Sequence, residues 1–136
     1  FSGELMLTIN KKDFDLGVTV YEAMPDGKLF HLGYALQRAS YAEDPTKRNL
    51  LSAGKPARVK FETAMTSRQM LPGSRLLVLV DAVKNPTAQV NYGTGKDVSD
   101  ESVKDAGDPL AIEIRSGSYF EVPLDNTFSS KPVNPQ

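Results

Sequence analysis

The residue types that could carry out catalysis are sparse in this chain. Its 136 residues include one histidine, His31, and no cysteine or tryptophan. A serine hydrolase needs a base that takes the proton of the serine hydroxyl, and histidine is the usual base. His31 lies within a strand-like pattern, and the nucleophile-elbow sequence Gly-x-Ser-x-Gly occurs nowhere. We therefore predict no catalytic residue, and we interpret His31 as a packed or solvent-facing strand histidine.

The sequence also lacks the residue patterns of known metal and cofactor sites. Without cysteine or a second histidine the chain offers no zinc-ligand set. The segment Gly93-Thr94-Gly95-Lys96 lacks the first glycine of a phosphate-binding loop and does not lead into a helix pattern, so we predict an ordinary loop. We expect no bound cofactor.

A cluster of acidic residues raises a calcium hypothesis, because hard cations take several oxygen ligands from one loop. The cluster consists of Asp97, Asp100, Glu101, Asp105 and Asp108. Its spacing does not match the EF-hand pattern, and Lys96 and Lys104 offset part of the charge. We expect a solvated, metal-free loop. The alternative is a carbohydrate-binding module with a calcium-stabilised β-sandwich, for which Tyr92 is the best sugar-stacking candidate.

Charge and hydropathy bear on the classes of partner. The chain has 16 Lys and Arg against 17 Asp and Glu, a net charge of −1, and no basic run. A nucleic-acid partner is therefore not expected. The longest apolar stretch is about six residues, far below the roughly twenty of a membrane span, so we predict no membrane association. The absence of cysteine leaves the redox compartment open.

The elements that would position any site have a period of two, which indicates strands with one buried face. Strands are expected over residues 4–9, 14–20, 29–36, 57–65, 76–82, 110–114 and 119–124. Turn residues at 25–27 and 116–118 predict two hairpins. Residues 76–82 are apolar on both faces, which predicts a strand in the middle of a sheet. These patterns favour an all-β sandwich or barrel over residues 1–124, followed by a polar tail over 125–136. The residues expected to be buried in the core are Val18, Val59, Phe61, Leu77, Leu79 and Ile112.

The order of several motifs resembles that of one enzyme family. The acidic strand start Asp13-Phe14-Asp15 leads to the turn Pro25-Asp26-Gly27, and a later apolar strand follows Gly73-Ser74-Arg75. Further matches are Gly33, Arg38, Tyr41, Asn85-Pro86 and the stretch 91–95. In this order they resemble the C-terminal domain of X-Pro dipeptidyl-peptidase and cocaine-esterase-like serine hydrolases, over about residues 3–124.

The resemblance implies a jelly-roll β-sandwich that is similar to galactose-binding domains. It also implies that this sandwich is appended to an α/β-hydrolase catalytic domain in the same polypeptide. The triad lies in that hydrolase part, and no position here matches it. We therefore expect a non-catalytic accessory domain, a piece of a longer hydrolase, which packs on the catalytic domain and helps wall its substrate pocket. Whether the parent acts on X-Pro peptides or acyl esters, and whether it is a homo-oligomer, stays open.

The connection over residues 83–108 is too long for a simple hairpin link, and long loops on rigid scaffolds commonly carry contacts. We expect it to form the interface with the catalytic domain. The candidate contact residues are Asn85, Pro86, Asn91 and Tyr92. An adhesion or assembly module is a third interpretation, beside the hydrolase accessory domain and the carbohydrate-binding module.

Overall fold

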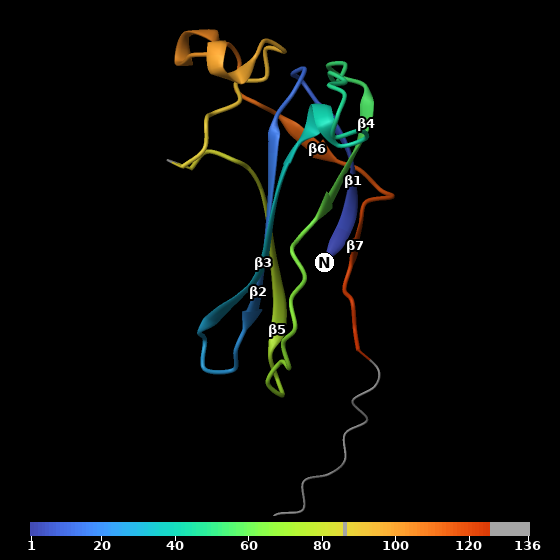
Figure 1. Cartoon of the computed structure of the whole chain (residues 1–136), viewed down its shortest axis with the longest axis vertical. Coiled ribbons are helices and arrows are strands. Elements are labelled where there is room, and N and C mark those ends of the chain that lie inside the picture. Colours follow the sequence, from blue (N-terminus) through green and yellow to red (C-terminus); the bar gives the residue numbers. More distant parts are fainter. Residues whose placement is uncertain (86, 126–136) are drawn as a thin grey trace, which may run out of the picture.

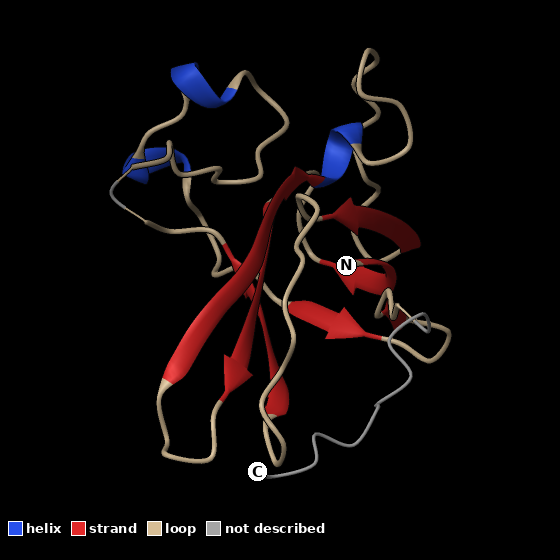
Figure 2. Cartoon of the chain, turned by 60° about the horizontal axis from the view of Figure 1, so that its bottom comes forward, coloured by secondary structure: helices blue, strands red, loops and turns tan. Residues whose placement is uncertain are grey.

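The computed structural model describes residues 1–85 and 87–125, which form two antiparallel sheets (Figures 1 and 2). The strands are β1 (Ser2–Ile9), β2 (Asp15–Ala23), β3 (Leu29–Arg38), β4 (Pro56–Glu62), β5 (Arg75–Ala82), β6 (Ile112–Ile114) and β7 (Tyr119–Glu121). Short 3-10 helices lie in the connections at Ala39–Tyr41, Val98–Asp100 and Val103–Asp105. The predicted all-β sandwich is confirmed, whereas all of the tail except Asp125 lies outside the described residues.

The first sheet has the strand order β3-β2-β5, so β2 is its centre and β5 is an edge strand. β2 and β3 form the hairpin that the Pro-Asp-Gly turn predicts. Gly27 takes a φ of 84°, and its N–H donates to the Met24 carbonyl at 2.9 Å. A side chain is disfavoured at this φ, which explains why glycine occupies the turn. One β-bulge interrupts the hairpin between Val20 and Tyr21.

The second sheet is built around β1, with β4 on one edge and both β6 and β7 on the other. β6 lies opposite residues 7–9 of β1 and β7 lies opposite residues 2–4, both antiparallel to β1. They are therefore consecutive pieces of one edge strand, and the hairpin predicted at residues 116–118 is wrong. The turn bulges out between the two pieces, where the Ser118 hydroxyl accepts from the Met6 N–H at 3.0 Å.

The core lies where β1, β2 and β4 face one another. Its members are Leu5, Leu7, Ile9, Phe14, Leu16, Val18, Ala35, Ala39, Val59 and Phe61. The alternation in the sequence placed most of these correctly, and the predicted burial of Val18, Val59 and Phe61 is confirmed. Met65 continues the same alternation but is 99% exposed, because β4 ends at Glu62.

The prediction for residues 76–82 is wrong, because β5 is not a central strand. Leu79 is 45% exposed and Leu77 is only half-buried. A run that is apolar on both faces indicates a strand covered on both sides. Among the described residues, however, β5 has a neighbouring strand on one side only. Ile112 is also exposed, since β6 is short and lies at the edge of its sheet.

Candidate functional site

His31 has no catalytic surroundings in the described part of the chain. It lies exposed on β3, and its ring meets the Tyr21 ring edge-on at 5.5 Å. Of the two alternatives from the sequence, a packed or a solvent-facing strand histidine, the structure shows the solvent-facing one. Across residues 1–85 and 87–125, no group of three or more His, Asp or Glu side chains could hold a metal ion. Nor do these residues contain a helix that is long and apolar enough to cross a membrane.

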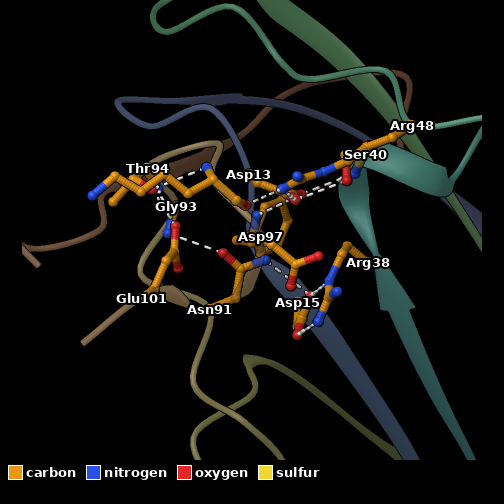
Figure 3. Close-up of polar contacts among 12 residues, drawn as sticks. Asp13, Asp15, Arg38, Ser40, Arg48, Asn91, Gly93, Thr94, Asp97 and Glu101 are labelled. Carbon is orange, nitrogen blue, oxygen red and sulfur yellow. Dashed lines mark hydrogen bonds and ion pairs between the residues drawn. The ribbon is translucent and has the colours of Figure 1, made fainter. Parts of the chain in front are cut away.

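Polar side chains from three distant segments meet at one end of the sandwich (Figure 3). We call this cluster the loop anchor; its residues are Asp13, Asp15, Arg38, Ser40, Arg48 and Asn91. At its centre the fully buried carboxylate of Asp13 accepts from the Ser40 hydroxyl at 2.7 Å and from the Ser40 and Phe14 N–H groups at 3.0 Å. Arg48 forms an ion pair with the same carboxylate at 3.3 Å. Asp13 thus joins the start of β2 to the connection that follows β3.

Asp15 extends the loop anchor toward the long connection. The pairing of β2 with β3 sets Arg38 directly opposite Asp15, and the guanidinium donates to both carboxylate oxygens at 2.8 and 3.0 Å. This hydrogen-bonded carboxylate raises the pKa of Arg38 above its ordinary value. The Asn91 amide donates to the same carboxylate at 3.1 Å. Residues that the family resemblance had singled out therefore hold one another in place.

The long connection closes on itself around Gly93. The Asn91 side chain accepts from the Gly93 N–H at 2.9 Å, and the Gly93 carbonyl accepts from the Lys12 N–H at 3.0 Å. Gly93 has a φ of 76°, and a Cβ there would lie 2.6 Å from the Asp13 carbonyl oxygen. Glu101 accepts from the Tyr92 N–H at 2.7 Å and also from Thr94. The segment is an ordered loop held by its own side chains.

Three of the five acidic residues in the cluster that raised the calcium hypothesis, Asp97, Glu101 and Asp105, accept hydrogen bonds from their own chain. Asp97 accepts from the Ser99 N–H at 3.0 Å. Asp105 pairs with Lys96 at 2.9 Å and accepts from the N–H and hydroxyl of Ser102. The hydrogen bonds from Lys96 and Ser102 lower the pKa of Asp105 to about 2. These carboxylates, which had suggested calcium binding, are occupied in capping loop turns.

The four predicted interface residues have different surroundings. Asn85 is exposed and accepts from the Thr87 N–H at 3.1 Å, whereas the Asn91 side chain points into the loop anchor. Tyr92 is half-buried. Pro86 lies outside the described residues. A shared interface role for these four stays a prediction.

An apolar surface that the sequence analysis missed covers the outward side of the β3-β2-β5 sheet. We call it the outer face; its residues are Tyr21, Leu29, Tyr34, Leu36, Leu77 and Leu79. The strand register places them on one side, since Tyr34 and Leu79 both lie opposite Thr19. Tyr34 is 40%, Leu79 45% and Leu36 51% exposed. Burial, with the carboxylates of Asp81 and Asp15 nearby, raises the pKa of Tyr34 above its ordinary value. The signal in the sequence was the apolar character of both faces of residues 76–82.

A second buried carboxylate, Glu22, lies on the opposite side of the same sheet. It is fully buried and accepts from the Ser74 hydroxyl at 2.6 Å and the Leu71 N–H at 2.8 Å. Arg68 pairs with it at 2.8 Å and also stacks over the Phe30 ring at 4.2 Å. These donors fasten the irregular segment after β4 to β2. Glu22 could have been noticed as the one acidic residue on the buried face of its strand.

Comparison with known proteins agrees with the β-sandwich fold. Residues 3–107 match the family model described as the X-Pro dipeptidyl-peptidase C-terminal non-catalytic domain. The chain is 27% identical over 104 residues to a cocaine esterase of Rhodococcus sp. (strain MB1 Bresler), covering 76% of this chain and 18% of the esterase. The crystal structure of an aminopeptidase from a marine sediment archaeon, Thaumarchaeota archaeon, superposes with a TM-score of 0.67 at 20% identity, covering 82% of this chain and 20% of that one. The chain therefore spans about a fifth of the length of these two proteins.

Proposed function

Because the chain belongs to the family of X-Pro dipeptidyl-peptidase C-terminal non-catalytic domains, we propose that it packs on an α/β-hydrolase catalytic domain of the same polypeptide. In that position it helps wall the substrate pocket of a serine hydrolase that acts on X-Pro peptides or acyl esters. The family match favours this function over the carbohydrate-binding alternative.

The observation that carries the proposal is the outer face. Leu29 is 53%, Leu36 51% and Leu79 45% exposed, and the register sets them on one side of one sheet. Exposed apolar side chains gathered on one side of a sheet commonly mark a contact with another protein surface. Aromatic residues are enriched at such contacts, and Tyr34 lies near the middle of the outer face.

The test compares one substitution in two settings, the isolated chain and the parent polypeptide. Leu36→Asp should change the free energy of unfolding of the isolated chain by only about 0.5 kcal/mol, because the side chain already meets water. In the parent the same change should lower the temperature of thermal inactivation and expose the domain junction to proteolysis, since a carboxylate would be buried in the contact. Met65→Asp, at a site that is 99% exposed and outside the outer face, is the matched control. Equal behaviour of the two variants in the parent would refute docking through the outer face.

The non-catalytic assignment also has a direct check. The isolated chain should hydrolyse neither X-Pro dipeptide anilides nor short acyl esters above the buffer background. His31→Ala should leave any trace rate unchanged, because the described residues give His31 an aromatic neighbour and no nucleophile. Turnover that this substitution abolishes would contradict an accessory role.

A further inference from the structure

An irregular segment between β4 and β5 lies against the inner side of the β3-β2-β5 sheet. Residues 63–74 contain no helix or strand, and they run from the end of β4 alongside this sheet to the start of β5 (Figures 1 and 2). We call this segment the strap. The Thr66 hydroxyl donates to the Leu32 carbonyl of β3, and a Cβ at Gly33 would lie 3.1 Å from the Thr63 side chain. Glycine at position 33 therefore leaves room for the strap.

The part of the sheet beneath the strap is buried without belonging to the core. Val20 is fully buried and Leu32 is 5% exposed, yet neither is a member of the core cluster between β1, β2 and β4. Val20 lies directly opposite Gly33, where the strap approaches most closely. Glu22 points to the same side as Val20, because alternate residues of a strand share a face. The strap thus covers a strip of the inner face that the second sheet does not reach.

The strap itself buries little apolar surface. Residues 64–69 are all exposed, with Met65 at 99%, and Leu71 is 48% exposed. A segment with few buried apolar contacts can open locally at a free energy below that of global unfolding. The attachment of the strap to the sheet therefore depends mainly on its polar contacts.

These polar contacts converge on one buried carboxylate, that of Glu22. It accepts from the Ser74 hydroxyl at 2.6 Å, from the Leu71 N–H at 2.8 Å and from the Arg68 Nε at 2.8 Å. All donors that Glu22 has within the described ranges belong to the strap. Hydrogen bonds to a charged acceptor are stronger than those between neutral groups. A single side chain of β2 thus holds three positions of the strap.

Both ends of the strap are fixed independently of this carboxylate. Thr63 is buried, and its N–H donates to the Phe1 carbonyl at 2.9 Å. At the other end Ser74 passes directly into β5, where Arg75 lies opposite Ala23 of β2. The residues between these two ends can therefore move while the strands on either side keep their partners.

We propose that the strap opens as a unit from the inner face of the β3-β2-β5 sheet while the rest of the sandwich stays folded, and that Glu22 holds it closed. In the open state the carboxylate exchanges its three donors for water, and Val20 and Leu32 become accessible to solvent. Arg68 also leaves the Phe30 ring, over which it stacks at 4.2 Å. All of these groups belong to this chain, so the proposal does not depend on docking to a catalytic domain.

Limited proteolysis of the 136-residue chain by trypsin tests the role of Glu22. Arg68 is the only basic residue of the strap, and its side chain must leave Glu22 before it can enter the protease pocket. Glu22→Gln keeps the side-chain shape but loses the charge, so cleavage after Arg68 should become roughly 10- to 100-fold faster. Glu43→Gln, the same change at an exposed site outside the strap, should leave this rate unchanged.

Cleavage after Arg58 in the same digest reports unfolding of the sandwich, because Arg58 lies within β4 opposite Met6 of β1. Mass spectrometry of the fragments distinguishes the two sites. The rate after Arg68 should rise in Glu22→Gln far more than the rate after Arg58. An equal rise at both sites would overturn separate opening of the strap, and an unchanged rate after Arg68 would overturn the role of Glu22.

Hydrogen exchange of the unmodified chain tests the opening without any substitution. The Leu71 N–H, which donates to Glu22, should exchange faster than the Val18 N–H of the central strand β2. Low concentrations of urea should hardly change the exchange of Leu71, because a local opening exposes little surface, whereas they should accelerate that of Val18. Equal exchange rates with the same urea dependence at the two amides would overturn the proposal.

Discussion

At the loop anchor each carboxylate is surrounded by donors of its own chain, whereas the charges along β5 have no ionic partner among the described residues. Asp13 accepts from Ser40, Phe14 and Arg48, and Asp15 accepts from Arg38 and Asn91. Arg75 and Asp81, by contrast, lie exposed beside an apolar strand edge. Both regions contain acidic and basic residues at strand ends, but only at the loop anchor do these residues pair with groups of the same chain. The difference separates residues that hold the fold together from residues that remain available for contacts.

The largest effect is expected at the centre of the loop anchor. Asp13→Ala removes the acceptor for the Ser40 groups and leaves the partly buried Arg48 without its carboxylate. Breaking such a pair from one side costs about 3–5 kcal/mol, measurable by urea denaturation. Asp100→Ala, at an exposed site in the long connection, is the matched control and should cost about 0.5 kcal/mol or less. Similar losses in the two variants would mean that the loop anchor does not stabilise the fold.

Truncating one leucine on each of two neighbouring strands compares a residue that holds the fold together with one that remains available for contacts. Leu16→Ala on β2 should cost about 2–5 kcal/mol, because the side chain is 2% exposed within the core. Leu79→Ala on β5 should cost about 1 kcal/mol or less, since that side chain is 45% exposed. Urea denaturation of the isolated chain measures both. A large loss at Leu79 at low protein concentration would show that β5 is covered within a single chain.

Two glycines with nearly the same φ allow the cost of backbone strain to be distinguished from the cost of a close contact. Gly54 has a φ of 74° with no atom near its Cβ position, and Gly93 has a φ of 76° with the Asp13 carbonyl oxygen 2.6 Å away. Alanine at either position costs about 1–2 kcal/mol for the left-handed backbone. Gly93→Ala should cost a further 1–3 kcal/mol, roughly the effect of overpacking. Equal free energies of unfolding for the two variants would mean that the long connection shifts freely.

The last expected effect is the dependence of stability on pH, which we assign to Glu22. Hydrogen bonds from Ser74, Leu71 and Arg68 lower the pKa of Glu22 from 4.5 to about 2. Because the pKa is lower in the folded chain, the stabilisation is complete above 4.5 and is lost as the pH falls toward 2. Glu22→Gln should be less stable near neutral pH and should lose less stability between about pH 5 and about pH 2. Parallel pH profiles for the variant and the unmodified chain would exclude Glu22 as the responsible group.

The alternation of apolar residues determined much of the fold in advance. Leu5, Leu7 and Ile9 on one strand, and Leu16 and Val18 on another, are buried as their spacing predicts. This success has a local cause, because successive side chains of a strand point to opposite faces wherever the strand lies. The turn at Gly27 was predictable for a similar reason, since it depends on the residues of the turn itself.

The sequence by itself determined which residues form strands, which face of most strands is apolar, and the order of motifs that places the chain in its family. Only the tertiary structure decided that β5 is an edge strand, that β6 and β7 are two pieces of one strand, and that Asp13, Arg48 and Asn91 meet. Strand neighbours and long-range polar contacts depend on how distant segments pair, which no short window of sequence contains. The exposure of β5 therefore could not be predicted from its apolar pattern, because the same residues would suit a strand covered on both faces equally well.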